Sequence, residues 1–577
     1  MNTSLTPALS IAHGLPLEAE PGLGALTIGG YLREVTRRHT GREALVIDLP
    51  SGERVSWSYD KLWERSLEVA KALIAAGVGK GTRVGILMSN RPEYLSSLFG
   101  IALAGGIAVS LSTFSTPSEL EHLLQASAVS IVLYDRQVLK TDFGAMLTEL
   151  EPAIQTSNAL TSSKFPFLQR LIVLEPAAAL GHAREDGRSV ERWSDFLAQG
   201  RGLSDSLVEA RAHTVKPHDA GGLFFSSGTT SVPKGILHAH RAFAIQWWRW
   251  PRVLRVNEPV RSWTGNGFFW SANITMVVGT AFSTGGAVIL QPTFEAEAAL
   301  TLIERERVSL MNGRPHQWVR LQSAPNWSRS DLSSVRYVPR GELIREHPSV
   351  QSQWERPNSF GTTETMTILS AYTSERPVER KPGAFGTPLP GNTLKVVHPH
   401  GGQTLPLGER GELCIKGPTL MLGYAGKSPE DTFDDEGYFH TGDGGFVDEE
   451  GRLFWEGRLT HLIKTGGANV SPEEVDAVIA SFPGVRRTQT VGVPHETLSE
   501  MVVACVVKLE GASLTEDALI AHLKTRLASF KVPRRVLFVE EAEFALTGNE
   551  KTKVDEIRKL ASQRLGVAPA SDPAARE

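Results

Sequence analysis

The stretch LFFSSGTTSVPKGILHAHRA, residues 223–242, joins a short apolar run to a polar loop that ends in one lysine. The run LFF is typical of a buried strand. The loop from Ser226 to Ser231 offers backbone N–H groups, hydroxyl groups and one glycine, and Lys234 adds a positive charge. Such donors suit the phosphates of a nucleotide. The loop lacks the GxxxxGKS or GxxxxGKT spacing of ordinary kinases and ATPases, and a polar surface turn is the alternative for this loop taken alone.

On both sides of this loop, apolar runs alternate with helical patterns, which indicates layers of sheet and helix. From Gly29 to Leu111 the chain contains LREVTRRH, ALVIDL, KLWERSLEVAKALIAAG, TRVGILM and YLSSLFGIALAGGIAVSL in turn. After Arg458 come a short strand, a helix that starts at Ser471, two longer strands and a helix at 515–527. We therefore predict a mixed α/β (α+β) fold with a large N-terminal domain and a small C-terminal domain.

The change of pattern after Arg458 sets the domain boundaries that we expect. A chain of 577 residues exceeds one ordinary hydrophobic core. We expect an N-terminal extension at residues 1–24, a large domain at 25–458, a small domain at 459–567 and a tail at 568–577. A division of the large region into two domains near Thr214–Pro217 stays open.

The overall charge and the cysteines exclude several classes of protein. The 60 basic and 64 acidic side chains give a net charge of -4, which provides no field for nucleic acid or an anionic membrane. Cys414 and Cys505 are too few for a disulfide framework and lack metal-ligand spacing. The sequence shows neither a signal-peptide pattern nor an apolar stretch of about 18 residues. We expect a cytoplasmic protein with no nucleic-acid partner and no integral membrane association.

Four further motifs follow the loop in order: NSFGTTE at 358–364, GYFHTGD at 437–443, GRLTHLIKTGGANV at 457–470 and LTGNEKTK at 546–553. With the loop, they resemble the motifs of the acyl-adenylate-forming superfamily, which includes acyl-CoA synthetases, coumarate-CoA ligases, luciferases and peptide-synthetase adenylation domains. The resemblance is nearest to the acid–CoA ligases. It implies ATP, Mg²⁺ and coenzyme A as cofactors, a large domain that binds ATP and the acid, and a small mobile domain that carries a catalytic lysine.

The resemblance implies roles for individual residues. Phe360 would stack on adenine, and Thr363 would contact the α-phosphate. Glu364 would hold Mg²⁺ together with Thr229, and a carboxylate is a ligand that Mg²⁺ prefers. Asp443 would accept both ribose hydroxyls. The other expected contacts to the nucleotide or to coenzyme A are Ser226, Ser227, Gly228, Thr230, Lys234, Gly361, Thr362, Arg458, Gly466 and Gly467.

The catalytic lysine that the resemblance implies falls in the C-terminal motif. Lys551 stands at the expected spacing, although Glu550 replaces the usual glycine. Lys553 is the alternative, and a solvated side chain would explain either lysine taken alone. Thr460, two residues after Arg458, is the expected hinge of the small domain, whose rotation would remove the lysine and admit a thiol.

The acid pocket is expected in the large domain. Its walls would come from residues 224–250, 263–274, 311–318, 336–343 and those after 364. Phe269 or Trp270 occupies the place of the gate, and Arg340 with Gly341 occupies the place of glycines in the floor. Eight of the 12 tryptophans lie between residues 247 and 354, which is compatible with an aromatic or bulky hydrophobic acid, although the same residues could simply build the core. Arg340 would either narrow the pocket or place a cation near the substrate.

We therefore predict an ATP-dependent carboxylic acid–CoA ligase that forms an acyl-AMP intermediate. The substrate carboxylate attacks the α-phosphorus, so no protein nucleophile is required. The alternative enzyme loads the phosphopantetheine of a carrier protein. The alternative of another class is a nucleotide-binding protein without ligase activity, which the replacements at Ser231, Arg340 and Glu550 would favour. The oligomeric state stays open, a homodimer included.

Overall fold

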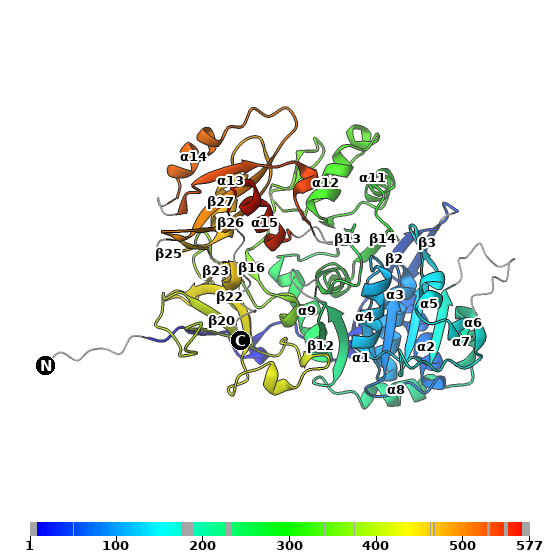
Figure 1. The fold of residues 1–577 in the computed structure, drawn as a ribbon. Coiled ribbons are helices and arrows are strands. Elements are labelled where there is room, and N and C mark those ends of the chain that lie inside the picture. Colours follow the sequence, from blue (N-terminus) through cyan, green and yellow to red (C-terminus); the bar gives the residue numbers. More distant parts are fainter. Residues whose placement is uncertain are drawn as a thin grey trace.

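The computed structural model describes residues 8–49, 51–174, 189–226, 233–339, 341–373, 376–461, 463–465, 468–527, 531–546 and 552–567. Figure 1 shows a large body built from the N-terminal and central parts of the chain, with a smaller body of residues 463–564, orange to red, beside it. No helix of the described residues has the length and apolar content that crossing a membrane requires.

The sheet that carries the polar loop has eight strands within the described chain. Their order is β10 (Val190–Arg192), β9 (Arg170–Leu174), β6 (Ile131–Asp135), β4 (Arg83–Leu87), β5 (Ile107–Ser110), β11 (Ala220–Phe225), β12 (Gly235–Ala239) and β21 (Gly423–Tyr424). The strands from β10 to β11 pair in parallel, and β12 and β21 are antiparallel to their neighbours. Because β5 pairs with β11, one sheet contains strands from both sides of Thr214–Pro217.

A second sheet lies beyond a layer of helices. Its order is β15 (Leu310–Asn312), β13 (Arg261–Thr264), β14 (Ala287–Leu290), β2 (Glu43–Asp48) and β3 (Arg54–Ser58). The helices that supply buried residues to the largest core are α1 (Ile28–Arg38), α2 (Tyr59–Ala75), α3 (Pro92–Ala104), α9 (His240–Val253) and α10 (Gly279–Thr284). Trp247 of α9 is fully buried, and its ring lies 4.5 Å from that of Tyr31 on α1. The middle helical layer therefore fixes α9, which directly follows the strand after the polar loop.

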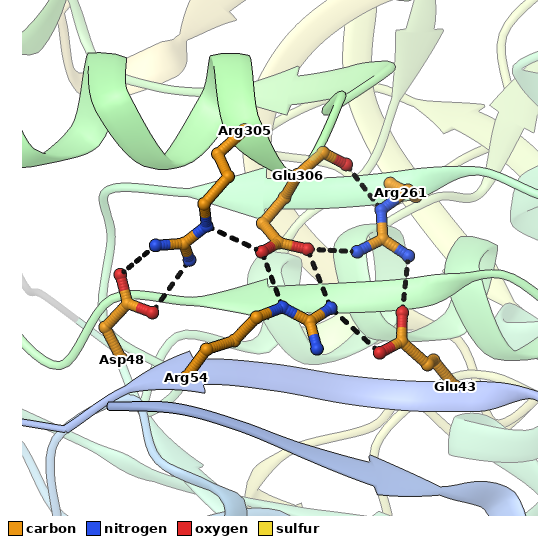
Figure 2. A network of polar contacts seen from close by, with 6 residues as sticks. All are labelled: Glu43, Asp48, Arg54, Arg261, Arg305 and Glu306. Carbon is orange, nitrogen blue, oxygen red and sulfur yellow. Dashed lines mark hydrogen bonds and ion pairs between the residues drawn. The ribbon is translucent and has the colours of Figure 1, made fainter. Parts of the chain in front are cut away.

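An ionic network ties the second sheet to a helix at its edge (Figure 2). Glu306 follows α11 (Ala296–Arg305), and its side chain is only 4% exposed. Its carboxylate accepts from Arg54 at 2.8 Å, from Arg261 at 2.5 Å and from Arg305 at 2.9 Å. Glu43 and Asp48 pair with the outer sides of the same arginines (Figure 2). The network joins β2, β3 and β13 to the end of α11.

The third sheet carries most of the GYFHTGD motif. Its order is β1 (Ile11–His13), β19 (Thr393–Val397), β20 (Gly411–Lys416), β22 (Phe439–Val447) and β23 (Leu453–Arg458). A three-stranded sheet of β16 (Ser359–Phe360), β17 (Ser370–Ala371) and β18 (Thr387–Pro388) lies in the same part of the chain. Because β1 pairs with β19 and Glu20 forms a buried ion pair with Arg249 at 2.6 Å, the described part of the expected N-terminal extension is built into the large body.

The C-terminal body has its own sheet and core. The strands are β25 (Ala468–Val470), β24 (Ile463–Thr465), β27 (Ser499–Lys508), β26 (Val485–His495) and β28 (Arg535–Phe538), covered by α13 (Pro472–Ala480), α14 (Glu516–Lys524) and α15 (Val554–Arg564). The Ser471 side chain accepts from the Glu474 backbone N–H at the start of α13, as the sequence predicts. The predicted mixed α/β class is confirmed.

The remaining elements complete the layers. The helices are α4 (Pro117–Ser127), α5 (Phe143–Leu150), α6 (Ala153–Thr156), α7 (Trp193–Gln199), α8 (Asp205–His213) and α12 (Pro315–Gln322), and β7 (Gln137–Val138) pairs with β8 (Thr141–Asp142). The short helical turns include a π-helical turn, η2 (Asn273–Val278), and 3₁₀ turns η5 (Thr363–Thr365) and η7 (Leu459–His461).

Candidate active site

The polar loop is closed at its base by its two strands. The Ser226 N–H donates to the Lys234 carbonyl at 3.0 Å, and the Lys234 N–H donates to Ser226 Oγ at 3.3 Å. Residues 227–232 lie outside the described residues, and with them Ser227, Gly228, Thr229 and Thr230. The two ends that are described place Ser226 and Lys234 together at the end of β11 and the start of β12.

Lys234, Tyr424 and Glu364 form a chain of contacts beside this loop. Lys234 Nζ lies 5.3 Å from the centroid of the Tyr424 ring, and the Tyr424 hydroxyl donates to Glu364 Oε1 at 2.9 Å. The pairing of Ile236 on β12 with Tyr424 on β21 sets this arrangement. The Glu364 backbone carbonyl also accepts from Met421 at 2.7 Å. Three segments far apart in the sequence therefore meet here.

Asp443 and Arg458 face each other on paired strands. They are direct partners in the register of β22 and β23, and Arg458 Nε lies 3.1 Å from Asp443 Oδ1. Asp443 is 2% exposed, whereas the Arg458 side chain is 46% exposed. The Thr441 hydroxyl accepts from the Asp443 N–H at 3.0 Å, and the Thr441 carbonyl accepts from Arg458 at 2.5 Å. The position of Asp443 is thus fixed, and part of the Arg458 side chain stays accessible to solvent.

Glu412 supports the segment before Asp443. One of its carboxylate oxygens accepts from the Gly442 N–H at 3.0 Å, and the other lies 2.9 Å from His440 Nδ1. Gly442 has a φ of +69°, a value that favours glycine at this turn. Cys414 Sγ also lies 3.4 Å from His440 Nδ1, and burial raises the pKa of this thiol.

The charges of these residues act on one another. Burial raises the pKa of Asp443, the charge of Arg458 opposes that shift, and the charges of Glu364 and Glu412 add to it. Burial also raises the pKa of Tyr424, together with the charge of Glu364 and the hydrogen bond to it. Glu364 and Asp443 are therefore close enough to repel each other, and a bound cation or a hydrogen-bonding ligand would relieve that repulsion.

A cavity of about 560 Å³ opens beside this group. Its lining combines aromatic and apolar side chains with polar ones. The residues are Phe225, Trp250, Asn266, Trp270, Ser271, Ala272, Asn273, Met276, Asn312, Gly313, Arg314, Pro315, Arg356, Ser359, Gly361, Thr362, Thr363, Thr367 and Ile368. Gly361, Thr362 and Thr363 of the second motif thus face the same space as Trp250 and Trp270. The expected wall segments around 250, 270 and 312 contribute to this cavity, as does the chain after 364.

The two alternatives for the tryptophans both apply, to different residues. Trp247, Trp263 and Trp318 are buried in the core, whereas Trp250 and Trp270 line the cavity. Of the two gate candidates, Trp270 lines the cavity, and Phe269 is 4% exposed and packs on Phe114 with 5.5 Å between ring centroids. The sequence period alone cannot separate these cases, because the residue type is the same at core and cavity positions.

Several other predicted residues have defined places. Phe360 is 7% exposed and packs on Trp455 at 6.2 Å between centroids. Gly341 has a φ of +88°, and its neighbour Arg340 lies outside the described residues. Thr460 lies in η7, directly after β23.

The C-terminal motifs are described at their edges. Thr465 pairs with Ala468, and Gly466 and Gly467 lie outside the described residues. Lys551 also lies outside them, in a segment whose ends meet where Leu546 pairs with Thr552. Lys553 is described, and its Nζ lies 3.0 Å from Glu556 Oε1 at the start of α15. These roles therefore stay predictions.

Three residues of the site have no signal in the sequence motifs. Tyr424 and Arg356 lie outside the five motifs. Glu412 lies in GELCIKG, a pattern that is typical of an ordinary strand. Tyr424 reaches Glu364 only through the pairing of β12 with β21, and Arg356 reaches the cavity only through the fold of the chain before β16. A search for charged or hydroxyl residues near the motifs would have found Arg356, two residues before NSFGTTE.

Comparison with known proteins agrees with this geometry. Residues 32–425 match the family described as AMP-binding enzyme, and residues 474–551 match the AMP-binding enzyme C-terminal domain. The chain is similar to the medium-chain acyl-CoA ligase ACSF2, mitochondrial, of Rattus norvegicus, with 28% identity over 93% of this chain and 88% of the relative. It is similar to a feruloyl-CoA synthase of Amycolatopsis sp, with 29% identity over 87% of this chain and 93% of the relative. Its fold is similar to that of the anthranilate CoA ligase AuaEII in complex with anthranoyl-AMP, with a TM-score of 0.75, 23% identity, and coverage of 96% and 100%.

Proposed function

The chain belongs to the AMP-binding enzyme family and is an AMP-forming acid–thiol ligase, and we propose that its substrate is a carboxylic acid with a bulky, largely apolar body. ATP, Mg²⁺ and coenzyme A are its cofactors. The observation that carries the proposal is one arrangement: Lys234, Tyr424 and Glu364 in contact, Asp443 and Arg458 beside them, and an aromatic-lined cavity that begins at Thr363.

The proposed reaction has two steps. In the first, an oxygen of the substrate carboxylate attacks the α-phosphorus of ATP, the bond to the bridging oxygen breaks, and pyrophosphate leaves with that electron pair. In the second, the sulfur of coenzyme A attacks the acyl carbon, and AMP leaves. Negative charge grows on the transferred phosphate in the first step, so donors and cations that are already in place lower its barrier.

The described residues would divide this work by their chemistry. Lys234, held at the loop base, would place a positive charge near the phosphates. Asp443 has two acceptor oxygens and a fixed position, which suits a pair of ribose hydroxyls. Arg458 would keep its ion pair with Asp443 while its exposed face reaches the ligand. Lys551 would act on the α-phosphate in the first step only.

The site also fits Mg²⁺. Among the described residues, Glu364 Oε1 accepts one hydrogen bond, from Tyr424, which leaves the second oxygen for a cation. A carboxylate oxygen is a ligand that Mg²⁺ prefers, and the ion would neutralise charge on phosphate oxygens. Tyr424 would hold the Glu364 carboxylate in one orientation, and the nearby charge of Asp443 would strengthen the attraction of a cation.

The acid would lie between the aromatic walls of the cavity. Trp250 and Trp270 face it, and Met276 of the π-helical turn and Ile368 add apolar surface. A volume of about 560 Å³ lies within the usual range for small-molecule sites. These walls favour an acid with an aromatic or branched body over a short polar one. Because Trp250 and Trp270 form these walls, an aromatic acid remains among the proposed substrates.

A pyrophosphate-exchange assay with a panel of acids tests the adenylation step, and the release of AMP with coenzyme A or a holo-carrier protein then identifies the acceptor. We expect exchange with bulky acids and thioester formation with coenzyme A. Asp443→Asn should raise the KM for ATP, whereas Glu449→Gln, an exposed acid in the turn after β22, should not. Background exchange with every acid while ATP still binds would refute the ligase function. Transfer to the carrier protein alone would refute coenzyme A as the acceptor.

A further inference from the structure

Two arginines, Arg314 and Arg356, line the cavity, and the proposed chemistry uses neither. The lining also includes Thr363 of the second motif, but not Lys234 or Glu364. The Arg356 side chain is accessible to solvent, yet burial among surrounding atoms lowers its pKa, and the charge of Glu342 only opposes that shift. The side chain therefore lies at the wall of the cavity and stays open to solvent.

The backbone that carries Arg356 is held in place. Arg345 donates to the carbonyls of Trp354, at 3.1 Å, and of Ser352. The Trp354 indole N–H donates to the Leu254 carbonyl at 2.8 Å, which ties the segment to the end of α9. The guanidinium therefore starts from a fixed point, and binding a ligand would cost little additional ordering of the main chain.

The neighbours of Arg356 leave its donors available. Its guanidinium carbon lies 5.9 Å from the centroid of the Trp250 ring, and the Trp250 indole N–H is already used by Thr367 Oγ1 at 3.2 Å. Within the described part of the chain, no side chain or carbonyl accepts a hydrogen bond from the guanidinium, and the charge of Glu342 acts on it through space. Its planar fork of N–H groups is thus available to a ligand in the cavity.

The asparagines of the cavity lining form hydrogen bonds with one another and with neighbouring groups. Asn273 Oδ1 accepts from Asn312 at 2.9 Å and from Thr264 at 3.2 Å, and Asn273 Nδ2 donates to the Gly267 carbonyl at 2.9 Å. The Asn266 side chain donates to the same threonine hydroxyl at 3.4 Å. These asparagines shape the wall around η2. Arg314, the other arginine of the lining, has its guanidinium carbon 5.1 Å from the centroid of the Trp270 ring and takes part in a further interaction. We therefore assign recognition of a charged or polar ligand group to Arg356.

We propose that the acid substrate carries an oxygen acceptor, a carboxylate or a keto group, remote from the carboxylate that is adenylated, and that Arg356 binds it. This inference rests on the proposed function. The apolar body would lie between Trp250 and Trp270, and the guanidinium fork would donate two parallel hydrogen bonds to the remote oxygens or one to a keto oxygen. A site built to donate hydrogen bonds to a substrate group rejects the analogue that lacks it, because its donors are then desolvated without a partner.

The test uses matched acids with one carbon skeleton: the parent monocarboxylic acid, the same acid with a remote carboxylate, and the same acid with a remote keto group. Pyrophosphate exchange gives kcat/KM for each acid with the full-length enzyme. We expect at least one substituted acid to exceed the parent acid by about 100-fold or more. Arg356→Met should reduce that ratio to within about threefold, through a fall in kcat/KM for the substituted acid without a fall for the parent acid.

Two further variants distinguish a remote carboxylate from a remote keto group and provide a control for effects on the fold. Arg356→Lys keeps the charge but not the fork, so it should retain more activity with the second carboxylate than with the keto group. Arg329→Met removes an exposed arginine that pairs with Glu297 of α11 outside the cavity lining, and it should leave all ratios unchanged.

The outcomes are distinct. Equal use of the parent and the substituted acids by the natural enzyme would overturn the inference and leave the ligase function standing. An equal loss for all three acids in Arg356→Met, with an unchanged melting temperature, would also overturn it, because Arg356 would then act only on the structure of the cavity. Absence of exchange with any acid would instead count against the proposed function.

Discussion

Replacement of Glu306 by glutamine tests whether the ionic network of Figure 2 holds the second sheet together. The substitution keeps the size of the side chain and one acceptor oxygen but removes the charge that Arg54, Arg261 and Arg305 share. Each arginine retains one other carboxylate partner, Glu43 or Asp48. The substitution therefore removes one negative charge, on a side chain that is 4% exposed.

The pKa of Glu306 sets the size of the effect. Burial alone would raise this pKa, but hydrogen bonds from Arg54 and Arg305 and the charges of Arg54 and Arg261 lower it from 4.5 to about 2. A shift of that size corresponds to about 3 kcal/mol of stability at neutral pH. Because the folded pKa is lowered, this contribution is complete above pH 4.5 and is lost as the pH falls towards 2. By pH 3.5 about 1.4 kcal/mol of it is gone.

Thermal unfolding followed by tryptophan emission measures the change. We expect Glu306→Gln to lower the melting temperature of the large body by about 3 °C at pH 7, and the gap to the natural protein to narrow at pH 3.5. Glu304→Gln, an exposed acid on α11, is the matched control and should shift the midpoint by about 1 °C or less. Equal midpoints for Glu306→Gln and the natural protein at pH 7, or a gap that widens in acid, would refute this account.

Three further predictions concern the active site. Tyr424→Phe removes the hydrogen bond to Glu364 Oε1, and the Mg²⁺ concentration for half-maximal pyrophosphate exchange should rise about three- to tenfold with protein stability nearly unchanged; no change in Mg²⁺ dependence would contradict the role given to Tyr424. Glu412→Gln loosens the turn at Gly442, so KM for ATP should rise about fivefold while kcat changes less, and a fall in kcat alone would place Glu412 elsewhere in the mechanism. Lys551→Ala should abolish adenylation but leave thioester formation from a supplied acyl-adenylate largely intact. Lys553→Ala removes the ion pair with Glu556 and should leave both steps intact. The reverse pattern would identify Lys553 as the catalytic lysine.

The fold class could be predicted because local sequence patterns indicate the individual helices and strands. The run TRVGILM becomes β4, and the helical pattern that follows Tyr59 becomes α2, since each apolar period matches one buried face. The Ser471 cap likewise marks the start of α13 from sequence alone. Sheet order was beyond the sequence, because β2 pairs with β14 across more than 200 residues and no local pattern encodes that partner.

The residues of the candidate site also divide into those that the sequence predicts and those that it does not. Glu364, Asp443 and Lys234 lie in recognisable motifs, so their neighbourhood could be predicted. Tyr424 and Arg356 acquire their places from long-range pairing and from a segment without regular structure. Arg340 drew attention in the sequence as a cation in the pocket floor, whereas the arginines that line the described cavity are Arg314 and Arg356, the latter in the chain before the second motif.

The contacts on either side of Thr460 limit where the small domain could pivot, a movement that stays our proposal. Arg458 is the last residue of β23, and its pairing with Asp443 and Thr441 fixes it to the large body. Ile463 is fully buried in the core of the C-terminal sheet, which fixes it to the small body. A rotation must therefore be absorbed between residues 459 and 462, and Thr460 lies inside that interval. A pivot placed earlier would break the Asp443–Arg458 pair on which nucleotide binding is proposed to depend. A proline at Thr460 should then impair transfer to the thiol more than adenylation, and equal loss of both steps would place the pivot elsewhere.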